Sequence, residues 1–152
     1  MEWPYDFISV ILAIVLGTAI GLEREISGKA AGLRTNILIC LGAAVFTIIS
    51  REMGGNDSGS PTRIAAQIVT GVGFLGAGAI IRDRGGVYGL TTAATIWLVA
   101  SVGMACGAHF YKLAGITTLL AILVLIGLGQ VEDHLARYRK KHNIVPLGDK
   151  EV

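Results

Sequence analysis

The side chains of this sequence that could do chemistry gather in three short charged clusters. Each cluster stands where a long apolar stretch begins or ends, and together they comprise Glu23, Arg24, Glu25, Arg34, Thr35, Asn36, Arg82, Asp83 and Arg84. Divalent cations such as Mg²⁺ are bound by carboxylate oxygens, so Glu23, Glu25 and Asp83 are the candidate metal ligands. All acidic residues lie at the edges of the apolar stretches or beyond them, which disfavours a metal site in the middle of a stretch.

Ion pairing is a second interpretation of the same clusters. If they reach one face of the folded chain, seven side chains could form a single ionic network: Glu23, Arg24, Glu25, Arg34, Asn36, Arg82 and Asp83. The alternative is a set of solvated flanking charges, because an exposed ion pair contributes only about 0–1 kcal/mol. Burial decides between the two, since removing one partner of a buried pair is costly.

The remaining reactive side chains are isolated from one another. His109, His134 and His142 match no zinc-binding spacing, and no nucleophile stands beside a general base. Cys40 and Cys106 lie inside apolar stretches, as is typical of small buried thiols. We therefore expect no enzymatic activity and no bound cofactor.

Five apolar stretches of about 16–18 residues carry the charged clusters. They run over residues 7–22, 35–50, 64–81, 90–106 and 113–129. Charged residues make up only 16% of the 152-residue chain, whereas a soluble domain is nearer a quarter charged. A soluble bundle also needs polar helix faces, which residues 119–128 lack. The sequence therefore predicts an all-α integral membrane protein with about five transmembrane helices within residues 1–131.

Lys and Arg are distributed unevenly over the two faces of such a bundle. With five spans, three of the thirteen basic residues, Arg51, Arg63 and Lys112, lie on one face, and the other ten lie on the opposite face. Because basic loops stay in the cytoplasm, we expect the N-terminus outside and the C-terminus inside. Residues 132–152 are then a basic cytoplasmic tail that attracts anionic lipid.

Glycine is frequent in the third apolar stretch. Gly71, Gly73, Gly76 and Gly78 include the G-x-G-x-x-G pattern, but dinucleotide binding would also need a preceding strand and a βαβ unit. Small residues on two sides of a helix let neighbouring backbones approach closely, so we expect this helix to be central in the bundle. The alternative is a weakened helix that lines a cavity at membrane depth.

Strongly polar side chains within the stretches are few. Gln67 is expected to face protein or water, either in an interhelical hydrogen bond or as a pore-lining group. The fourth stretch opens with Thr91, Thr92 and Thr95. A threonine hydroxyl can bond to its own helix, and a ligand contact is the alternative.

Four segments of the chain together form a family signature. Residues 21–25 read Gly-Leu-Glu-Arg-Glu, residues 32–35 Gly-Leu-Arg-Thr, residues 71–80 contain the glycines, and residues 89–94 read Gly-Leu-Thr-Thr-Ala-Ala. Their order and spacing resemble the MgtC/SapB family of bacterial inner-membrane proteins over about residues 7–129. The resemblance implies a five-span bundle with the orientation inferred above. It also implies a link to magnesium homeostasis. The family is named for its association with magnesium-transport operons and with survival in low magnesium or inside host cells.

The resemblance implies regulation rather than a settled chemistry. Members of the founding branch are thought to modulate other membrane proteins, including the ATP synthase. Many members also carry a small cytoplasmic C-terminal α/β domain. This sequence ends about twenty residues after its last apolar stretch, so it resembles a short form without that domain.

Two functions stay open at this point. The first is a regulator that contacts the lipid bilayer and other membrane proteins, such as the ATP synthase or a transporter, and that can form a homo-oligomer. The alternative is a Mg²⁺ transporter or channel subunit with a polar path through Gln67, Thr70, Thr91 and Thr95. Neither function calls for nucleic acid as a partner.

Overall fold

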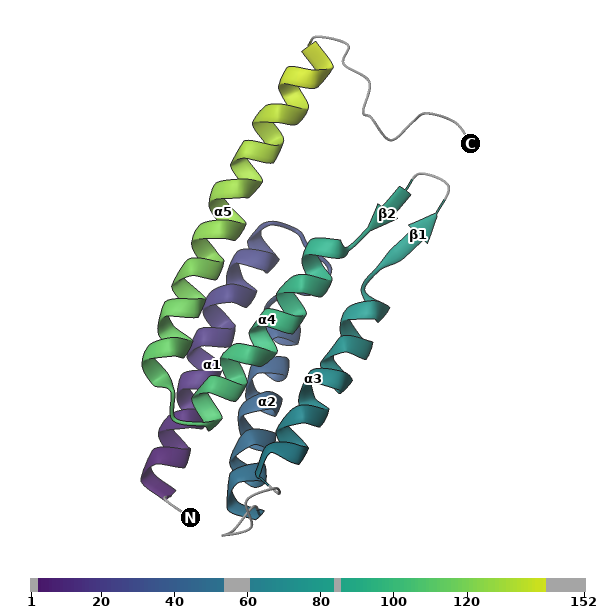
Figure 1. The fold of residues 1–152 in the computed structure, drawn as a ribbon. Coiled ribbons are helices and arrows are strands. Elements are labelled where there is room, and N and C mark those ends of the chain that lie inside the picture. Colours follow the sequence, from purple (N-terminus) through teal and green to yellow (C-terminus); the bar gives the residue numbers. More distant parts are fainter. Residues whose placement is uncertain (1–2, 54–60, 84–85, 142–152) are drawn as a thin grey trace.

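Five helices and one short β-hairpin make up the computed structural model, which describes residues 3–53, 61–83 and 86–141. The helices are α1 (Trp3–Ile26), α2 (Leu33–Met53), α3 (Pro61–Gly78), α4 (Leu90–Gly107) and α5 (Tyr111–Lys141), and the strands are β1 (Ile81–Asp83) and β2 (Gly86–Tyr88). Figure 1 shows the helices side by side along one direction, with the hairpin and the far end of α5 projecting from the same end. The predicted helical bundle is therefore confirmed.

Four of the five predicted spans are confirmed by length and composition. They are α1, α2, α4 and the first part of α5, Tyr111–Gly129. The fifth, α3, has a shorter apolar segment over Ala65–Gly78. It lies alongside its neighbours in Figure 1, and its 18 residues reach about 27 Å at 1.5 Å per residue. That length is close to the roughly 30 Å of hydrocarbon in a bilayer.

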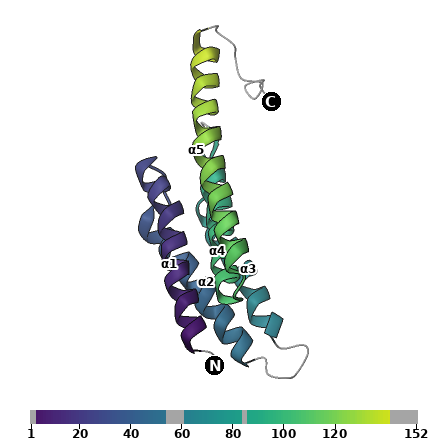
Figure 2. The same ribbon diagram turned by 90° about the vertical axis from the view of Figure 1, so that its left-hand side faces the viewer.

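The predicted boundary at residue 131 falls inside a helix. The long helix α5 continues unbroken through it to Lys141, and Figure 2 shows this helix extending well beyond the others. The predicted basic tail therefore begins as part of α5, and its residues 142–152 lie outside the described part of the chain.

The core of the bundle is made of small apolar side chains. One buried cluster joins α1, α2, α4 and α5 through Ala13, Ile20, Cys40, Ala44, Val99, Val102, Cys106, Ala114 and Ala121. Cys40 and Cys106 are buried free thiols in this cluster, which confirms their assignment as small apolar residues. Because most of these side chains are short, the helix backbones can approach one another closely.

Glycines on α1 and α4 set the distance to α2. A Cβ built on Gly17 would lie 2.9 Å from the Cβ of Cys40, and one on Gly21 would lie 3.0 Å from the Cα of Leu33. A Cβ on Gly103 would overlap the carbonyl oxygen of Cys40. Helix α2 is thus held between two glycine-bearing helices. A shift of its backbone away from one of them would bring it into the other.

The central position predicted for the third stretch is wrong. Helix α3 packs mainly against α2 and α4 through one narrow stripe that includes Ile68 and Val72. Cβ atoms at Gly71, Gly73 and Gly78 would meet nothing within 4 Å. A glycine pattern shows where a neighbour can approach, but it does not show whether this chain supplies that neighbour.

The predicted extension of the third stretch to Ile81 is also wrong. Helix α3 ends at Gly78, and the chain then forms an antiparallel hairpin in which Ile81 faces Tyr88 and Asp83 faces Gly86. Gly89, with φ of 86°, turns the chain into α4, and a Cβ there would overlap the carbonyl oxygen of Ala79. The hairpin carries its charged residues away from the bundle.

We predict that Gly103→Ala destabilises the fold by about 1–3 kcal/mol, because the new methyl group meets the backbone of α2, which cannot rotate away. Unfolding in mixed micelles measures the change. Gly115→Ala is the matched control, since a Cβ at Gly115 meets nothing within 4 Å. Equal loss of stability in both variants would show that the α2–α4 approach does not set the packing.

Candidate functional site

Arg24 contacts Glu23 and Thr92 where α1 ends and α4 begins, and Asn36 of α2 packs against Gly21 in the preceding turn of α1. We name these four residues the polar junction: Glu23, Arg24, Asn36 and Thr92. Arg24 in the last turn of α1 is only 3% exposed, Asn36 near the start of α2 is fully buried, and Thr92 in the first turn of α4 is also buried. Two of the segments that carry the family resemblance, 21–25 and 89–94, thus supply Glu23, Arg24 and Thr92, and Asn36 directly follows a third, 32–35.

Arg24 is the charged centre of the polar junction. Its Nη2 donates to Oγ1 of Thr92 at 3.5 Å, and its Nη1 lies 3.8 Å from Oε2 of Glu23. Both contacts are long for a buried guanidinium, and its Nε has no hydrogen-bond partner among the described residues. A buried cation needs close pairing to offset the loss of water, so Arg24 retains hydrogen-bonding capacity.

Asn36 and Glu23 leave acceptor atoms in the same region. The side-chain amide of Asn36 donates to the carbonyl oxygens of Ala31 at 2.7 Å and Gly32 at 2.8 Å. Its Oδ1 and the Oε2 of Glu23 are buried and accept no hydrogen bond from the described residues. The polar junction can therefore accept hydrogen bonds through two oxygens and donate through Arg24, a pattern suited to a small polar species that does both.

The turn between α1 and α2 is fixed by Glu25. Its Oε2 accepts a hydrogen bond from the backbone N–H of Leu33 at 2.9 Å, which satisfies one of the free N–H groups at the start of α2. A Cβ on Gly32 would overlap that same Oε2, so glycine at this position makes room for the cap. The neighbouring carboxylate, that of Glu23, is positioned by Ser27, whose hydroxyl donates to its Oε1 at 2.8 Å.

The metal site suggested by Glu23, Glu25 and Asp83 is not assembled. No group of three or more Asp, Glu, His or Cys residues within residues 3–53, 61–83 and 86–141 could hold a metal ion. Glu25 is engaged at the start of α2, and Asp83 lies exposed on the hairpin. Glu23 and Glu25 lie on α1, whereas Asp83 lies on β1 of the hairpin. This hairpin was not predicted from the sequence, and it separates Asp83 from the two glutamates.

The single ionic network predicted for seven side chains forms only in part. Glu23 pairs with Arg24, and Asn36 bonds to the backbone of Ala31 and Gly32, whereas Arg34 and Arg82 are exposed. The solvated interpretation is therefore correct for the outer arginines, and the buried interpretation is correct for Arg24.

The threonines of α4 divide into two roles. Thr95 donates to the carbonyl oxygen of Thr91 at 2.8 Å, within its own helix. Thr92 accepts a hydrogen bond from Arg24 and so links α4 to α1. Gln67 lies exposed on α3 and makes no hydrogen bond to the described residues.

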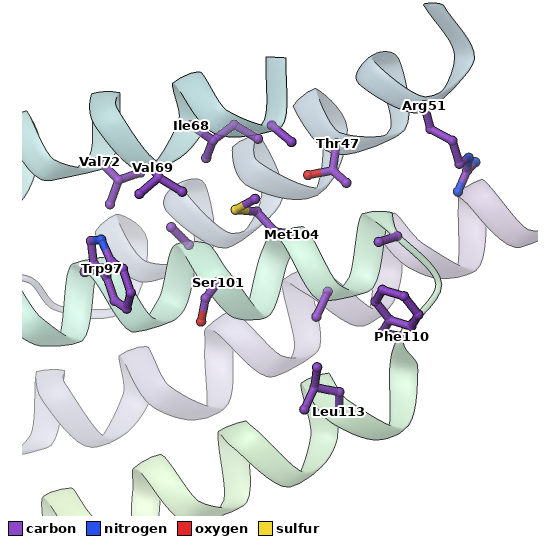
Figure 3. Close-up of a pocket in the computed structure, with 14 residues that line it drawn as sticks. Thr47, Arg51, Ile68, Val69, Val72, Trp97, Ser101, Met104, Phe110 and Leu113 are labelled. Carbon is purple, nitrogen blue, oxygen red and sulfur yellow. The ribbon is translucent and has the colours of Figure 1, made fainter. Parts of the chain in front are cut away.

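Two grooves flank α3 on its two sides. The α2–α3 groove, of about 540 Å³, is lined by residues that include Leu38, Gly42, Phe46, Gln67, Gly71 and Leu75. The α3–α4 groove, of about 570 Å³, includes Val72, Trp97, Ser101 and Met104, with Arg51 and Phe110 at one end, as Figure 3 shows. Arg51 is the one charged side chain among the described residues that line the two grooves.

A second polar cluster, at the opposite end of the bundle, is not evident from the sequence. Asp6 of α1, Arg51 of α2 and His109 of the α4–α5 turn are in mutual contact there. Their positions at the edges of apolar stretches were the available signal. Their pairing depends on how three distant segments meet, and periodicity carries no information on that.

Comparison with known proteins gives consistent similarities. The model of the MgtC family matches residues 10–134. The chain is 49% identical over 112 residues to "Protein MgtC" of Brucella abortus, covering 74% of this chain and 46% of that protein. It is 47% identical over 127 residues to "Putative magnesium transporter YhiD" of Escherichia coli, covering 78% of this chain and 58% of that one.

A further relative, "Protein MgtC" of Salmonella typhimurium, is 43% identical over 135 residues, covering 89% of this chain and 57% of that protein. The chain spans about half the length of the curated relatives it matches. No solved structure matches it.

We predict that Glu25→Ala destabilises the fold by about 1 kcal/mol, the usual cost of losing a helix cap. Gly32→Ala should cost a similar amount, because its methyl group displaces the Glu25 carboxylate. The double variant should cost no more than Glu25→Ala alone, since the methyl group then meets no carboxylate. Unfolding in mixed micelles checks the cycle, and additive losses would refute the capping role.

Proposed function

Because the chain belongs to the MgtC family, we propose that it regulates other membrane proteins in a magnesium-related process through helix–helix contacts, without itself carrying Mg²⁺. It is a multi-pass membrane protein with four helices long and apolar enough to cross a bilayer. We place it in the bacterial inner membrane, with the polar junction toward the cytoplasm. The excess of Lys and Arg at that end supports this orientation.

The α2–α3 groove is the observation that carries the proposal. Gly42 and Gly71 line it, and Cβ atoms at both positions would meet nothing within 4 Å. The small residues leave space for a neighbouring helix backbone, which is how transmembrane helices associate in lipid. The occupant we propose is therefore an uncharged transmembrane helix of another membrane protein.

Gln67 gives this groove its one amide side chain. It lies about 9 Å along α3, at 1.5 Å per residue from Pro61, and so within the apolar thickness of the bundle. A polar side chain at such a depth is stabilised by a hydrogen bond across a helix interface. A partner helix that offers a hydroxyl or amide beside a bulky apolar side chain would match both Gln67 and the two glycines.

Transport is the second candidate, because the relative from Escherichia coli is named a putative magnesium transporter. The positions of the polar residues disfavour it. Gln67 lies on the exposed side of α3, and the hydroxyl of Thr95 bonds within its own helix. Dehydrating Mg²⁺ takes several oxygen ligands, and the described residues of a single chain do not align such ligands along the bundle.

We expect Mg²⁺ uptake into proteoliposomes that hold the purified chain to equal that of empty liposomes. A fluorescent Mg²⁺ indicator inside the vesicles measures the flux. Uptake that requires the protein and is abolished by Glu23→Gln and Gln67→Ala would establish the transport function instead.

We expect Gly71→Leu to reduce co-purification of a membrane-protein partner about tenfold or more, because the added side chain fills the α2–α3 groove; tenfold corresponds to about 1.4 kcal/mol. Gly73→Leu is the matched control: it adds the same side chain to the same helix, outside that groove. The measurement is the yield of one identified partner in mild detergent. Equal yields from both variants, or a groove occupied only by lipid or by a second copy, would contradict the proposed surface.

A further inference from the structure

The end of the bundle opposite the polar junction holds an ion-pair cluster in which Asp6 is buried and the other members are partly exposed. We name it the histidine cluster: Asp6, Arg51, Glu52 and His109. Arg51 is at its centre. Its Nη2 donates to Oδ1 of Asp6, and its Nη1 donates to the carbonyl oxygen of Gly107 at 2.9 Å. One guanidinium therefore ties the start of α1 and the end of α4 to α2.

His109 completes the cluster in a defined protonation state. Its Nε2 lies 2.9 Å from Nη1 of Arg51 and 3.3 Å from Oδ1 of Asp6. A guanidinium can only donate hydrogen bonds, so Nε2 must accept the one from Arg51. The imidazole in this arrangement is neutral, with its proton on Nδ1.

A second proton on His109 would make this arrangement unfavourable. Nε2 would then carry a hydrogen that points at the N–H groups of Arg51, and two cations would stand within hydrogen-bond distance. The same Nε2–H is already 3.3 Å from a carboxylate oxygen of Asp6 and can donate to it. Protonated His109 and Arg51 would thus compete for one oxygen atom.

The cluster contains carboxylates for both cations. Asp6 is 7% exposed, and its Oδ2 has no partner among the described residues. Glu52 Oε1 lies 3.7 Å from Nη2 of Arg51, whereas His109 contacts Nη1. With His109 neutral, the cluster holds one cation and two carboxylates. With His109 protonated it holds two of each, so protonation balances the charge and gives Arg51 a second position near Glu52.

The other titratable groups around His109 are phenols. Among the described side chains, the ring of Tyr5 on α1 lies 6.0 Å from the imidazole, and the ring of Tyr111 on α5 lies 5.6 Å from it. The hydroxyl of Tyr111 is hydrogen-bonded to the backbone of Tyr5 and to Ser9. Among the residue types present in this cluster, histidine is the one that commonly acts as a proton-sensing group in proteins.

The backbone of His109 supports a role for its side chain. Its φ is 64°, the left-handed conformation in which helices commonly end with glycine. The turn is closed by its N–H to Cys106 at 3.0 Å and by that of Phe110 to Ala105 at 2.8 Å. A non-glycine residue is strained in this conformation, and its presence points to contacts made by the imidazole.

We propose that the histidine cluster is an acid-responsive latch: it joins α1, α2 and the α4–α5 turn at neutral pH and releases Arg51 toward Glu52 when His109 binds a proton. Arg51 also lines one end of the α3–α4 groove, where Figure 3 shows its side chain beyond Thr47. Release would move the charged side chain that lines this groove among the described residues. The inference is independent of the proposed function.

Nitrogen NMR of the full chain in detergent micelles tests the latch. With ¹⁵N-histidine and ¹⁵N-arginine labels, we expect His109 Nε2 to be unprotonated at pH 8 and both ring nitrogens to be protonated at pH 5. Over the same range, the slowly exchanging guanidinium signal of Arg51 should lose at least half its intensity. Spectra of His109→Asn and Arg51→Lys assign the two signals.

His109→Asn is also the matched control, because asparagine tolerates the left-handed conformation, accepts a hydrogen bond and does not titrate. Its Arg51 signal should not change with pH. If this variant fails to fold, His109→Gly keeps the turn and should also lose the pH response. Glu52→Gln removes the second carboxylate and should move the transition to lower pH. An Nε2–H tautomer at pH 8, or an Arg51 response that persists in both histidine variants, would overturn the proposal.

Discussion

The close approach of three helix backbones is the constraint on which the rest of this structure depends. Helix α2 lies between Gly17 and Gly21 of α1 on one side and Gly103 of α4 on the other, with no room for a methyl group at these contacts. In lipid, no hydrophobic effect drives helices together, so packing at this distance supplies much of the association. The short separation of the α1, α2 and α4 backbones also determines which side chains of different helices come into contact.

Both polar clusters follow from that packing. At one end, the buried Arg24 of α1 reaches Thr92 of α4, and Asn36 at the start of α2 is buried as well. At the other end, Arg51 joins Asp6 to the carbonyl oxygen of Gly107. The bundle is thus held by close apolar contacts along its length and by one arginine at each end, and polar chemistry concentrates where helices begin and end.

Helix α3 stands apart from this arrangement. It contributes a narrow buried stripe around Ile68 and Val72, and its other sides, with most of its glycines, face outward. Small residues that pack nothing within the chain favour contact with another helix, and the adjoining grooves are almost free of charge. This member of the MgtC family therefore combines a closely packed three-helix core with an outer helix whose small residues mostly face outward.

The sequence by itself determined the membrane class, the number of helices and the approximate bounds of most of them, because hydrocarbon thickness selects apolar stretches of a definite length whatever their neighbours are. It also identified Arg24, Asn36 and Thr92 as polar residues at the ends of stretches. Only the tertiary structure decided which of them meet, that Asp83 lies on a hairpin, and that Gly103 packs while Gly71 faces outward. Hydropathy records how each segment interacts with lipid, whereas pairing depends on the relative rotation and depth of helices that are far apart in the chain.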